Sequence, residues 1–174
     1  MVTEDERINT IGWSWYSINK MEMNYTIRLM KIEDYPRVNE LWRETEGLSL
    51  EESDSKEAIA IYLQRNRGFC FVACNGDQII GTILCGHEGR RGILRHLAVR
   101  KDYRQAGIAK MLIERCLSAL ARAGIKKCNL FVLNTNVEGR SFWEHMGWTI
   151  LEDNFRMLQT TTLGSIHKPE KGRR

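Results

Sequence analysis

The chain has little proline, no long apolar run and no dense charge of one sign, and each shortage excludes a class of protein. Two prolines among 174 residues exclude collagen-like and proline-rich disordered chains. No stretch approaches the ~20 consecutive apolar residues that a membrane-spanning helix requires, so we expect no membrane partner. Acidic residues lie near the first methionine, where a signal peptide needs positive charge, so we expect a cytoplasmic protein.

Cysteine is present, but not in the spacing of a metal site or of a disulfide framework. The five cysteines are an odd number, contain no CxxC pair and lie in apolar segments. Buried free thiols of a cytoplasmic protein explain this pattern best. We therefore expect no disulfide, no metal site and no nucleophilic cysteine.

The net charge of +4 is spread along the chain. Residues 1–23 hold two basic and four acidic side chains, and the ending HKPEKGRR holds four basic residues and one acidic residue. A domain that binds phosphate backbones usually shows a denser basic stripe with interleaved aromatic residues. We therefore expect no nucleic-acid partner and interpret residues 164–174 as a basic, disordered tail.

The composition, 43% hydrophobic and 28% charged, is that of one globular domain, which we expect over residues 24–163. The leader, residues 1–23, contains Trp13 and Trp15 but no other structural signal. Two explanations stay open: the leader packs on the domain, or translation begins at Met21 or Met23. We favour the second explanation.

Hydrophobic periodicity predicts an α+β protein in which a long helix links two parallel strands of a mostly antiparallel sheet. Asn75-Gly76-Asp77 joins two β-rich runs, and Asn-Gly suits the positive backbone angles of a tight hairpin. Gly124 follows the longest helical pattern and suits a helix C-terminus. The expected strands are residues 25–30, 69–74, 78–86, 91–99 and 126–133, with a final strand or strand pair over 148–162, and the expected helices are residues 32–45, 55–66, 107–123 and 137–146.

The run VRKDYRQAGIAKMLIERCL, residues 99–117, predicts an anion site at the start of a helix. A strand ends near Val99 and an amphipathic helix begins near Gly107, where Gly107 and Ala109 let the backbone approach a ligand closely. The free N–H groups of the first helical turn attract a pyrophosphate, and Arg104 flanks them. The start of the helix alone supports equally well an alternative in which Gly107 only begins the helix and binds no ligand. The nucleotide-binding loops GxGxxG and GxxxxGK are absent from the sequence.

Two motifs resemble those of the GNAT superfamily of N-acetyltransferases. LAVRKDYRQAGIA resembles its acetyl-CoA signature, whose core Arg/Gln-x-x-Gly-x-Gly/Ala reads here as Arg104-Gln105-Ala106-Gly107-Ile108-Ala109. LFVLNTNVEGRSFWEHMGW resembles the second signature, with Asn136 at the motif asparagine, Phe142-Trp143 at the Phe-Tyr pair and Gly147-Trp148 at the Gly-Phe pair. The element order of residues 24–160 also resembles that fold.

The resemblance implies a splayed mixed sheet of about six or seven strands flanked by about four helices. It implies direct transfer of the acetyl group from acetyl-CoA to a primary amine, either a protein N-terminus or a small molecule, in a ternary complex without a metal. The protein would be a monomer or a homodimer. The cofactor-binding residues implied are Leu97, Ala98, Val99, Arg104, Gln105, Ala106, Gly107, Ile108, Ala109, Asn136 and Trp143.

Each of these residues has an expected role. The backbone of residues 97–99 would hydrogen-bond the pantetheine arm like an added strand, because a splayed sheet leaves such groups unpaired. A backbone N–H of Leu97 or Val99 would donate to the developing oxyanion. The N–H groups of residues 105–109 would hold the pyrophosphate. Asn136 would bond the far side of the pantetheine and also cap the helix that follows it.

Trp143 stands where many relatives place a tyrosine that protonates the leaving thiolate. An indole N–H is far too weak an acid for that role. A thiol of pKa ~8.5 lies only ~1.5 units above pH ~7, a difference of ~2 kcal/mol, so solvent can supply the proton. The missing tyrosine still leaves an alternative open, an acyl-CoA-binding module without useful catalysis.

His96 is the candidate general base, because it lies beside the expected oxyanion donors and an ordinary imidazole, of pKa ~6.5, takes up protons near neutral pH. The alternative is a structural or surface histidine. Deprotonating a lysine amine of pKa ~10.4 at pH ~7.4 costs ~4 kcal/mol, whereas an α-amine near ~7.8 costs under ~1 kcal/mol. A weak base therefore favours an α-amine or a small amine of low pKa.

Overall fold

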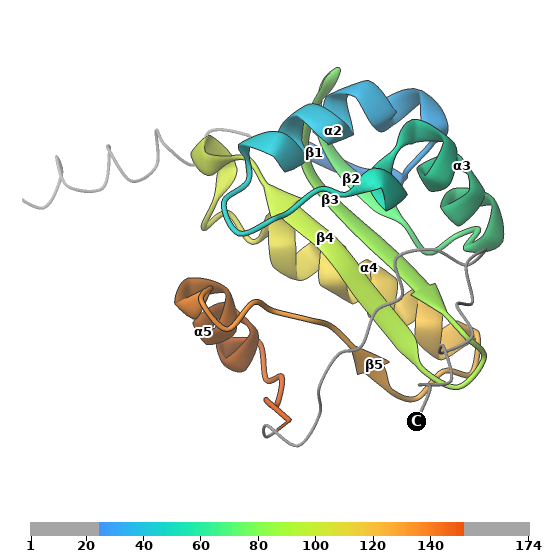
Figure 1. Ribbon diagram of the computed structural model, residues 1–174, viewed down its shortest axis with the longest axis vertical. Helices are drawn as coiled ribbons and strands as arrows, with labels where there is room; N and C mark the ends of the chain where they lie inside the picture. Colours follow the sequence, from blue (N-terminus) through green and yellow to red (C-terminus); the bar gives the residue numbers. More distant parts are fainter. Residues whose placement is uncertain (1–24, 152–174) are drawn as a thin grey trace, which may run out of the picture.

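The computed structural model describes residues 25–151, which form a five-stranded mixed sheet with helices on both faces (Figure 1). The sheet order is β1-β2-β3-β4-β5. The strands and helices in chain order are β1 (Tyr25–Leu29), α2 (Tyr35–Glu44), α3 (Lys56–Arg65), β2 (Phe71–Asn75), β3 (Gln78–His87), β4 (Gly92–Val99), α4 (Ile108–Arg122), β5 (Cys128–Asn129) and α5 (Val137–His145). Short 3₁₀ turns are η2 (Ile32–Asp34), η3 (Glu52–Asp54) and η4 (Lys101–Tyr103). The predicted α+β class is confirmed.

The sheet combines an antiparallel meander with one parallel pair. Strands β1 to β4 pair antiparallel with their neighbours, and β5 pairs parallel with β4. Helix α4 makes the connection between the two parallel strands, as predicted. The parallel ladder is short, since only Gly92 and Ile93 of β4 have partners in β5. The sheet is therefore closed at one end of β4 and open along the rest of that strand.

Two apolar cores sandwich the sheet. On one face, α4 buries a row at helical spacing, including Ile108, Leu112 and Cys116, against β2 and β3. On the other face, Val38 and Trp42 of α2 pack with those residues of the same strands whose side chains point to that face. Figure 1 shows the same arrangement, with α2 and α3 over one face and α4 over the other. Burial on both faces fixes the sheet, because apolar area removed from water is the main stabilising contribution.

Glycines at three turns adopt the left-handed backbone that their positions require. Gly76 has φ 56° in the β2–β3 hairpin, and the hairpin prediction is confirmed. Gly107 has φ 80° directly before α4, and Gly124 has φ 78° directly after its end. An L-residue with a side chain pays a steric cost in this region, which glycine avoids. The predicted boundaries of α4 follow from these two residues.

The sequence overestimates the strands at the C-terminal side. The apolar run of residues 126–133 predicted a full strand, but β5 contains Cys128–Asn129 alone, and Phe131 is largely exposed. A strand needs a neighbour with free backbone groups in register, and β4 and β5 separate after two residues. Residues 148–151 of the predicted final strand are not in a strand, and residues 152–162 lie outside the described part.

The leader and the tail, residues 1–23 and 164–174, also lie outside the described residues, so the domain limits stay a prediction. Within residues 25–151, no helix is long and apolar enough to cross a membrane.

Candidate active site

The centre of the candidate site is a β-bulge in β4. Thr82 lies opposite Ala98 while Leu84 lies opposite Arg95, so β4 holds one residue more than β3 over this interval. His96 lies in the bulge with φ 51°, a left-handed conformation that is uncommon for a residue with a side chain. The bulge reverses the alternation of the strand, so that Arg95 and His96 are on the same face.

One edge of β4 is open at the level of the bulge. Because β5 pairs only with Gly92 and Ile93, residues 94–99 have no strand partner on that side within residues 25–151. Leu97 and Val99 pack on the α4 core, and Ala98 packs on the α2 core. Their side chains therefore point to the two faces of the sheet, and backbone groups alone line the open edge. N–H and C=O groups on such an edge can bond an extended ligand as a further strand would.

A chain of hydrogen bonds fixes the bulge from the α2 face. The indole N–H of Trp42 donates to Thr82 Oγ1 over 2.8 Å, and the Thr82 hydroxyl donates to the carbonyl oxygen of His96 over 3.1 Å. The rings of Trp42 and His96 also pack together, with centroids 4.7 Å apart. Both Trp42 and Thr82 are fully buried. A buried hydrogen-bonded network of this kind rigidifies the residue that it ends on.

The His96 imidazole faces a carboxylate. Its Nε2 lies 3.0 Å from Asp54 Oδ1, and the two side chains are only 13% and 11% exposed. The two atoms lie within hydrogen-bond distance, although the ring N–H is not ideally aligned on the oxygen. Burial lowers the pKa of His96, and the carboxylate of Asp54 partly opposes that shift. His96 is therefore neutral at neutral pH and able to accept a proton.

The second part of the site is the loop that leads from β4 to α4. Gly107 is the N-cap residue of α4, and no side chain caps the helix there. A Cβ atom on Gly107 would meet no heavy atom within 4 Å, so the first turn of α4 faces open space. Gln105 has φ 63°, and the two left-handed residues turn this loop sharply before the helix. An uncapped helix start with free N–H groups and the positive end of the helix dipole is an anion-binding feature.

Two side chains hold this loop in place. The Tyr25 hydroxyl of β1 donates to the carbonyl oxygen of Ala106 over 3.2 Å. Arg104 donates from Nε to the carbonyl oxygen of Val99 over 3.4 Å and is otherwise exposed. The Arg104 charge thus lies between the end of β4 and the start of α4. Ile108 anchors the first turn in the α4 core.

Helix α5, which has Asn136 as its N-cap residue and contains Trp143, lies at the other side of the open β4 edge (Figure 1). The Asn136 side chain caps α5 by accepting the N–H of Gly139 over 2.8 Å, as predicted. Its amide also lies close to the loop after α2, because a Cβ atom on Gly47 would be 2.6 Å from Asn136 Nδ2. Trp143 packs edge-to-face between Phe142 and Trp148. The α2–η3 loop and α5 therefore meet across the open side of the sheet.

Three of the described cysteines are poorly suited to act as nucleophiles. Burial raises the pKa of Cys70 and of Cys128 to about 12, and it also raises the pKa of Cys74. A thiol becomes nucleophilic only as a thiolate, so these groups are unreactive near neutral pH.

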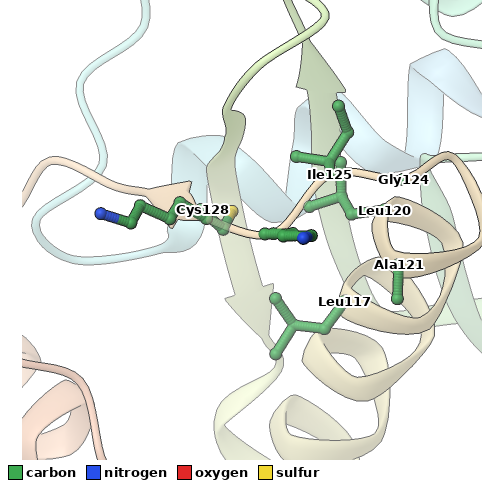
Figure 2. A pocket seen from close by; sticks show the side chains of 8 residues that line it. Leu117, Leu120, Ala121, Gly124, Ile125 and Cys128 are labelled. Carbon is green, nitrogen blue, oxygen red and sulfur yellow. The ribbon is translucent and has the colours of Figure 1, made fainter.

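A surface pocket lies at the C-terminal end of α4, far along the helix from Gly107 (Figure 2). None of the residues predicted for the site lines it. The lining residues are Leu117, Leu120, Ala121, Gly124, Ile125, Lys126, Lys127 and Cys128. The pocket is distinct from the loop and bulge described above.

The family to which the chain belongs follows from comparison with known proteins. The model of the Acetyltransferase (GNAT) family matches residues 35–148, which is more than half of the chain. The chain belongs to the GNAT family. An acetyltransferase of Sodalis glossinidius (strain morsitans) is 30% identical over 132 residues, 76% of this chain and 92% of the relative. An acetyltransferase of Pectobacterium atrosepticum is 31% identical over 110 residues, 63% of this chain and 77% of the relative.

Solved structures show the GNAT fold as well. The PaiA N-acetyltransferase of Thermoplasma acidophilum, in complex with coenzyme A, matches with a TM-score of 0.68 at 24% identity, over 76% of this chain and 94% of that chain. At this identity the likeness shows the fold. Family membership makes this GNAT protein an acetyltransferase, and the resemblance noted in the two sequence motifs is confirmed.

Sequence reasoning missed several residues of this GNAT site. Asp54, Trp42 and Thr82 surround the bulge, and Tyr25 supports the loop before α4. Thr82 is a polar residue in a β-rich run, Trp42 and Tyr25 are aromatic residues in apolar patterns, and Asp54 is one of several acidic residues in a polar segment. Such signals are common in any domain. The roles predicted for the individual site residues remain predictions.

Proposed function

We propose that this GNAT protein transfers the acetyl group of acetyl-CoA to a primary amine by direct attack in a ternary complex. The observation that carries this proposal is the uncapped start of α4 at Gly107, which a short loop connects to the open edge of β4. A backbone anion site beside a free strand edge suits a ligand with a pyrophosphate at one end and an extended amide arm at the other.

Acetyl-CoA supplies, when bound, an acetyl group activated as a thioester. The N–H groups of residues 105–109 would bind the pyrophosphate and Arg104 would add a charge contact. The backbone of residues 97–99 would bond the pantetheine arm, with Asn136 and Trp143 on its far side. The N–H of Leu97 or Val99 would donate to the carbonyl oxygen as negative charge develops there. His96 would accept the proton of the amine.

The base assigned to His96 favours one class of acceptor. Burial makes His96 a weaker base than a free imidazole. A lysine amine remains almost fully charged near pH ~7.4, whereas an α-amine near pKa ~7.8 is substantially neutral. We therefore propose an α-amine, of a peptide N-terminus or a small molecule, rather than a lysine side chain.

The test is thiol release from acetyl-CoA across a library of N-terminal peptides, amino acids, polyamines and lysine peptides, alongside calorimetric binding. We expect turnover with at least one class of α-amine that exceeds turnover with lysine side chains at equal concentration. Tight acetyl-CoA binding with no turnover for any amine would instead support an acyl-CoA-binding module. The tryptophan at position 143 is the observation that favours this second function.

Trp143→Tyr tests whether the missing tyrosine limits turnover, because it introduces a phenol where a thiolate proton donor is expected. Solvent protonation of the thiolate leaves at most ~2 kcal/mol to gain, so we expect kcat to stay constant or to rise by no more than ~30-fold. The Kd of acetyl-CoA should not change, since the backbone contacts remain. Stopped-flow thiol release and calorimetry measure the two quantities. A fall in kcat with an intact fold would show that the indole itself has a positive role in turnover.

A further inference from the structure

We propose that Asp54 is the positioning residue of His96, holding its Nε2 so that Nδ1 is the nitrogen that accepts the proton of the amine. This inference rests on the proposed function, because it assigns a partner to the proposed base.

The contact joins two elements that are far apart in the sequence. Asp54 ends the 3₁₀ turn η3 on the α2–α3 connection, and His96 lies in the bulge of β4. Their side chains approach to 3.0 Å, and both are nearly enclosed. A buried carboxylate is costly unless a cation or donors satisfy it. Within the described residues, the side chain that faces Asp54 Oδ1 as a possible donor is the His96 imidazole.

The carboxylate is held before it reaches the histidine. Asp54 Oδ2 accepts the backbone N–H of Glu51 over 3.0 Å, which leaves Oδ1 directed at His96. The Tyr35 hydroxyl donates to the carbonyl oxygen of Asp54 over 2.8 Å and ties η3 to α2. These two hydrogen bonds to η3 and α2 therefore fix the position of Oδ1.

The histidine is held as firmly from its own side. Its left-handed backbone would suit glycine or asparagine better, so the chain retains a strained residue at this place. The hydrogen bond from the Thr82 hydroxyl to the His96 carbonyl oxygen fixes the bulge. The ring of Trp42 packs on the imidazole and fixes its plane. Non-glycine residues in sparsely populated conformations cluster at functional sites.

The charges around His96 define what Asp54 does to it. From η3 it faces Asp54, from its own strand it faces Arg95, and from α2 it faces the uncharged ring of Trp42. Burial disfavours the protonated imidazole most, Asp54 favours it, and Arg95 also opposes it. In neutral histidine, the nitrogen beside a carboxylate carries the proton and the other nitrogen is the acceptor. Asp54 therefore selects the Nε2–H tautomer and leaves Nδ1 basic.

The first test measures the coupling without any substrate. Asp54→Asn keeps an oxygen for the Glu51 N–H but removes the charge, so the NMR titration midpoint of His96 should move to lower pH. His96→Asn, which tolerates the left-handed backbone, identifies the His96 signal. Glu52→Gln is the matched control, because it removes one negative charge from an exposed side chain of the same turn. In this variant the titration midpoint of His96 should stay at the wild-type value. An unchanged or raised midpoint in Asp54→Asn overturns the proposal.

The second test measures the consequence for turnover. With an amine that the wild type acetylates, Asp54→Asn should lower kcat/KM by about tenfold or more at neutral pH, within the ~10²-fold or larger factor that a general base contributes. The acidic limb of its pH profile should move to lower pH, and the Kd of acetyl-CoA should not change. In the His96→Asn background, Asp54→Asn should have almost no further effect.

These outcomes separate a positioning role from a structural one. If Asp54→Asn lowers kcat/KM equally in the wild-type and His96→Asn backgrounds, Asp54 does not act through His96 and the proposal fails. If no amine is acetylated by the wild type, the proposed function fails and the base role fails with it. The NMR titration then still shows whether Asp54 and His96 are coupled.

Discussion

Gly107→Glu is expected to abolish acetyl-CoA binding while the protein stays folded. Gly107 has φ 80° at the uncapped start of α4, where the free N–H groups would bind the pyrophosphate. The space beside its Cβ is empty of protein atoms, so a side chain there enters the ligand's volume and not the core. The carboxylate also places negative charge against phosphates. Calorimetry should detect no binding, and circular dichroism should show wild-type helix and strand content.

Gly124→Glu is the matched control for this prediction. Gly124 flanks the other end of α4 with φ 78°, and its Cβ position is also open. The two variants share the same charge change and the same left-handed strain, of ~1–2 kcal/mol. We expect Gly124→Glu to lose a similar amount of stability and to bind acetyl-CoA with the wild-type Kd. A comparable loss of binding in both variants would attribute the effect to strain alone.

Arg104→Ala should have a smaller effect at the same place. It removes one charge-assisted contact but leaves the backbone N–H groups, so the loss should be ~1–2 kcal/mol, or roughly 5- to 30-fold in Kd. The contrast with Gly107→Glu assigns the affinity to the backbone. A folded Gly107→Glu variant that binds acetyl-CoA as tightly as the wild type would place the phosphate site elsewhere.

The sequence predicted those features that depend on neighbouring residues. A left-handed turn restricts the choice of residue, so Gly76, Gly107 and Gly124 marked a hairpin and both ends of α4 without tertiary information. Helical spacing of apolar residues likewise predicted the buried face of α4. The two GNAT motifs lie on these same local features, which explains why the family was evident from the sequence.

Features that depend on distant partners could not be predicted in this way. Nothing in RGILRHLAV marks a bulge at His96, because the strained residue is neither glycine nor asparagine. The short β5 depends on how far β4 and β5 diverge, which the apolar run of residues 126–133 does not reveal. In the sequence, Asp54 is one of several acidic residues in a polar segment, and only the fold brings it to His96.

Trp42→Ala is expected to lower the free energy of unfolding by ~3–5 kcal/mol, the range for removing a large buried aromatic side chain. Trp42 is completely buried between α2 and the sheet, and its indole N–H begins the chain of bonds to Thr82 and His96. A domain of this size is stable by only about 5–15 kcal/mol, so about a fifth or more of its stability is at stake. Urea unfolding followed by circular dichroism measures the change.

Ile61→Ala provides the control, because Ile61 is 68% exposed on the neighbouring helix α3 and should change stability by no more than ~0.5 kcal/mol. A loss below ~1 kcal/mol in Trp42→Ala would contradict the view of Trp42 as the centre of this core.

Trp42→Phe separates the packing of Trp42 from its hydrogen bond. Phenylalanine keeps an aromatic ring against His96 but cannot donate to Thr82, whose hydroxyl still donates to the His96 carbonyl. The lost bond should cost ~1–2 kcal/mol, clearly less than Trp42→Ala. If the bond also fixes the bulge, kcat should fall in Trp42→Phe while the Kd of acetyl-CoA, which depends on the separate loop at Gly107, stays constant. A wild-type kcat in a folded Trp42→Phe variant would show that Thr82 alone is sufficient to hold His96 in place.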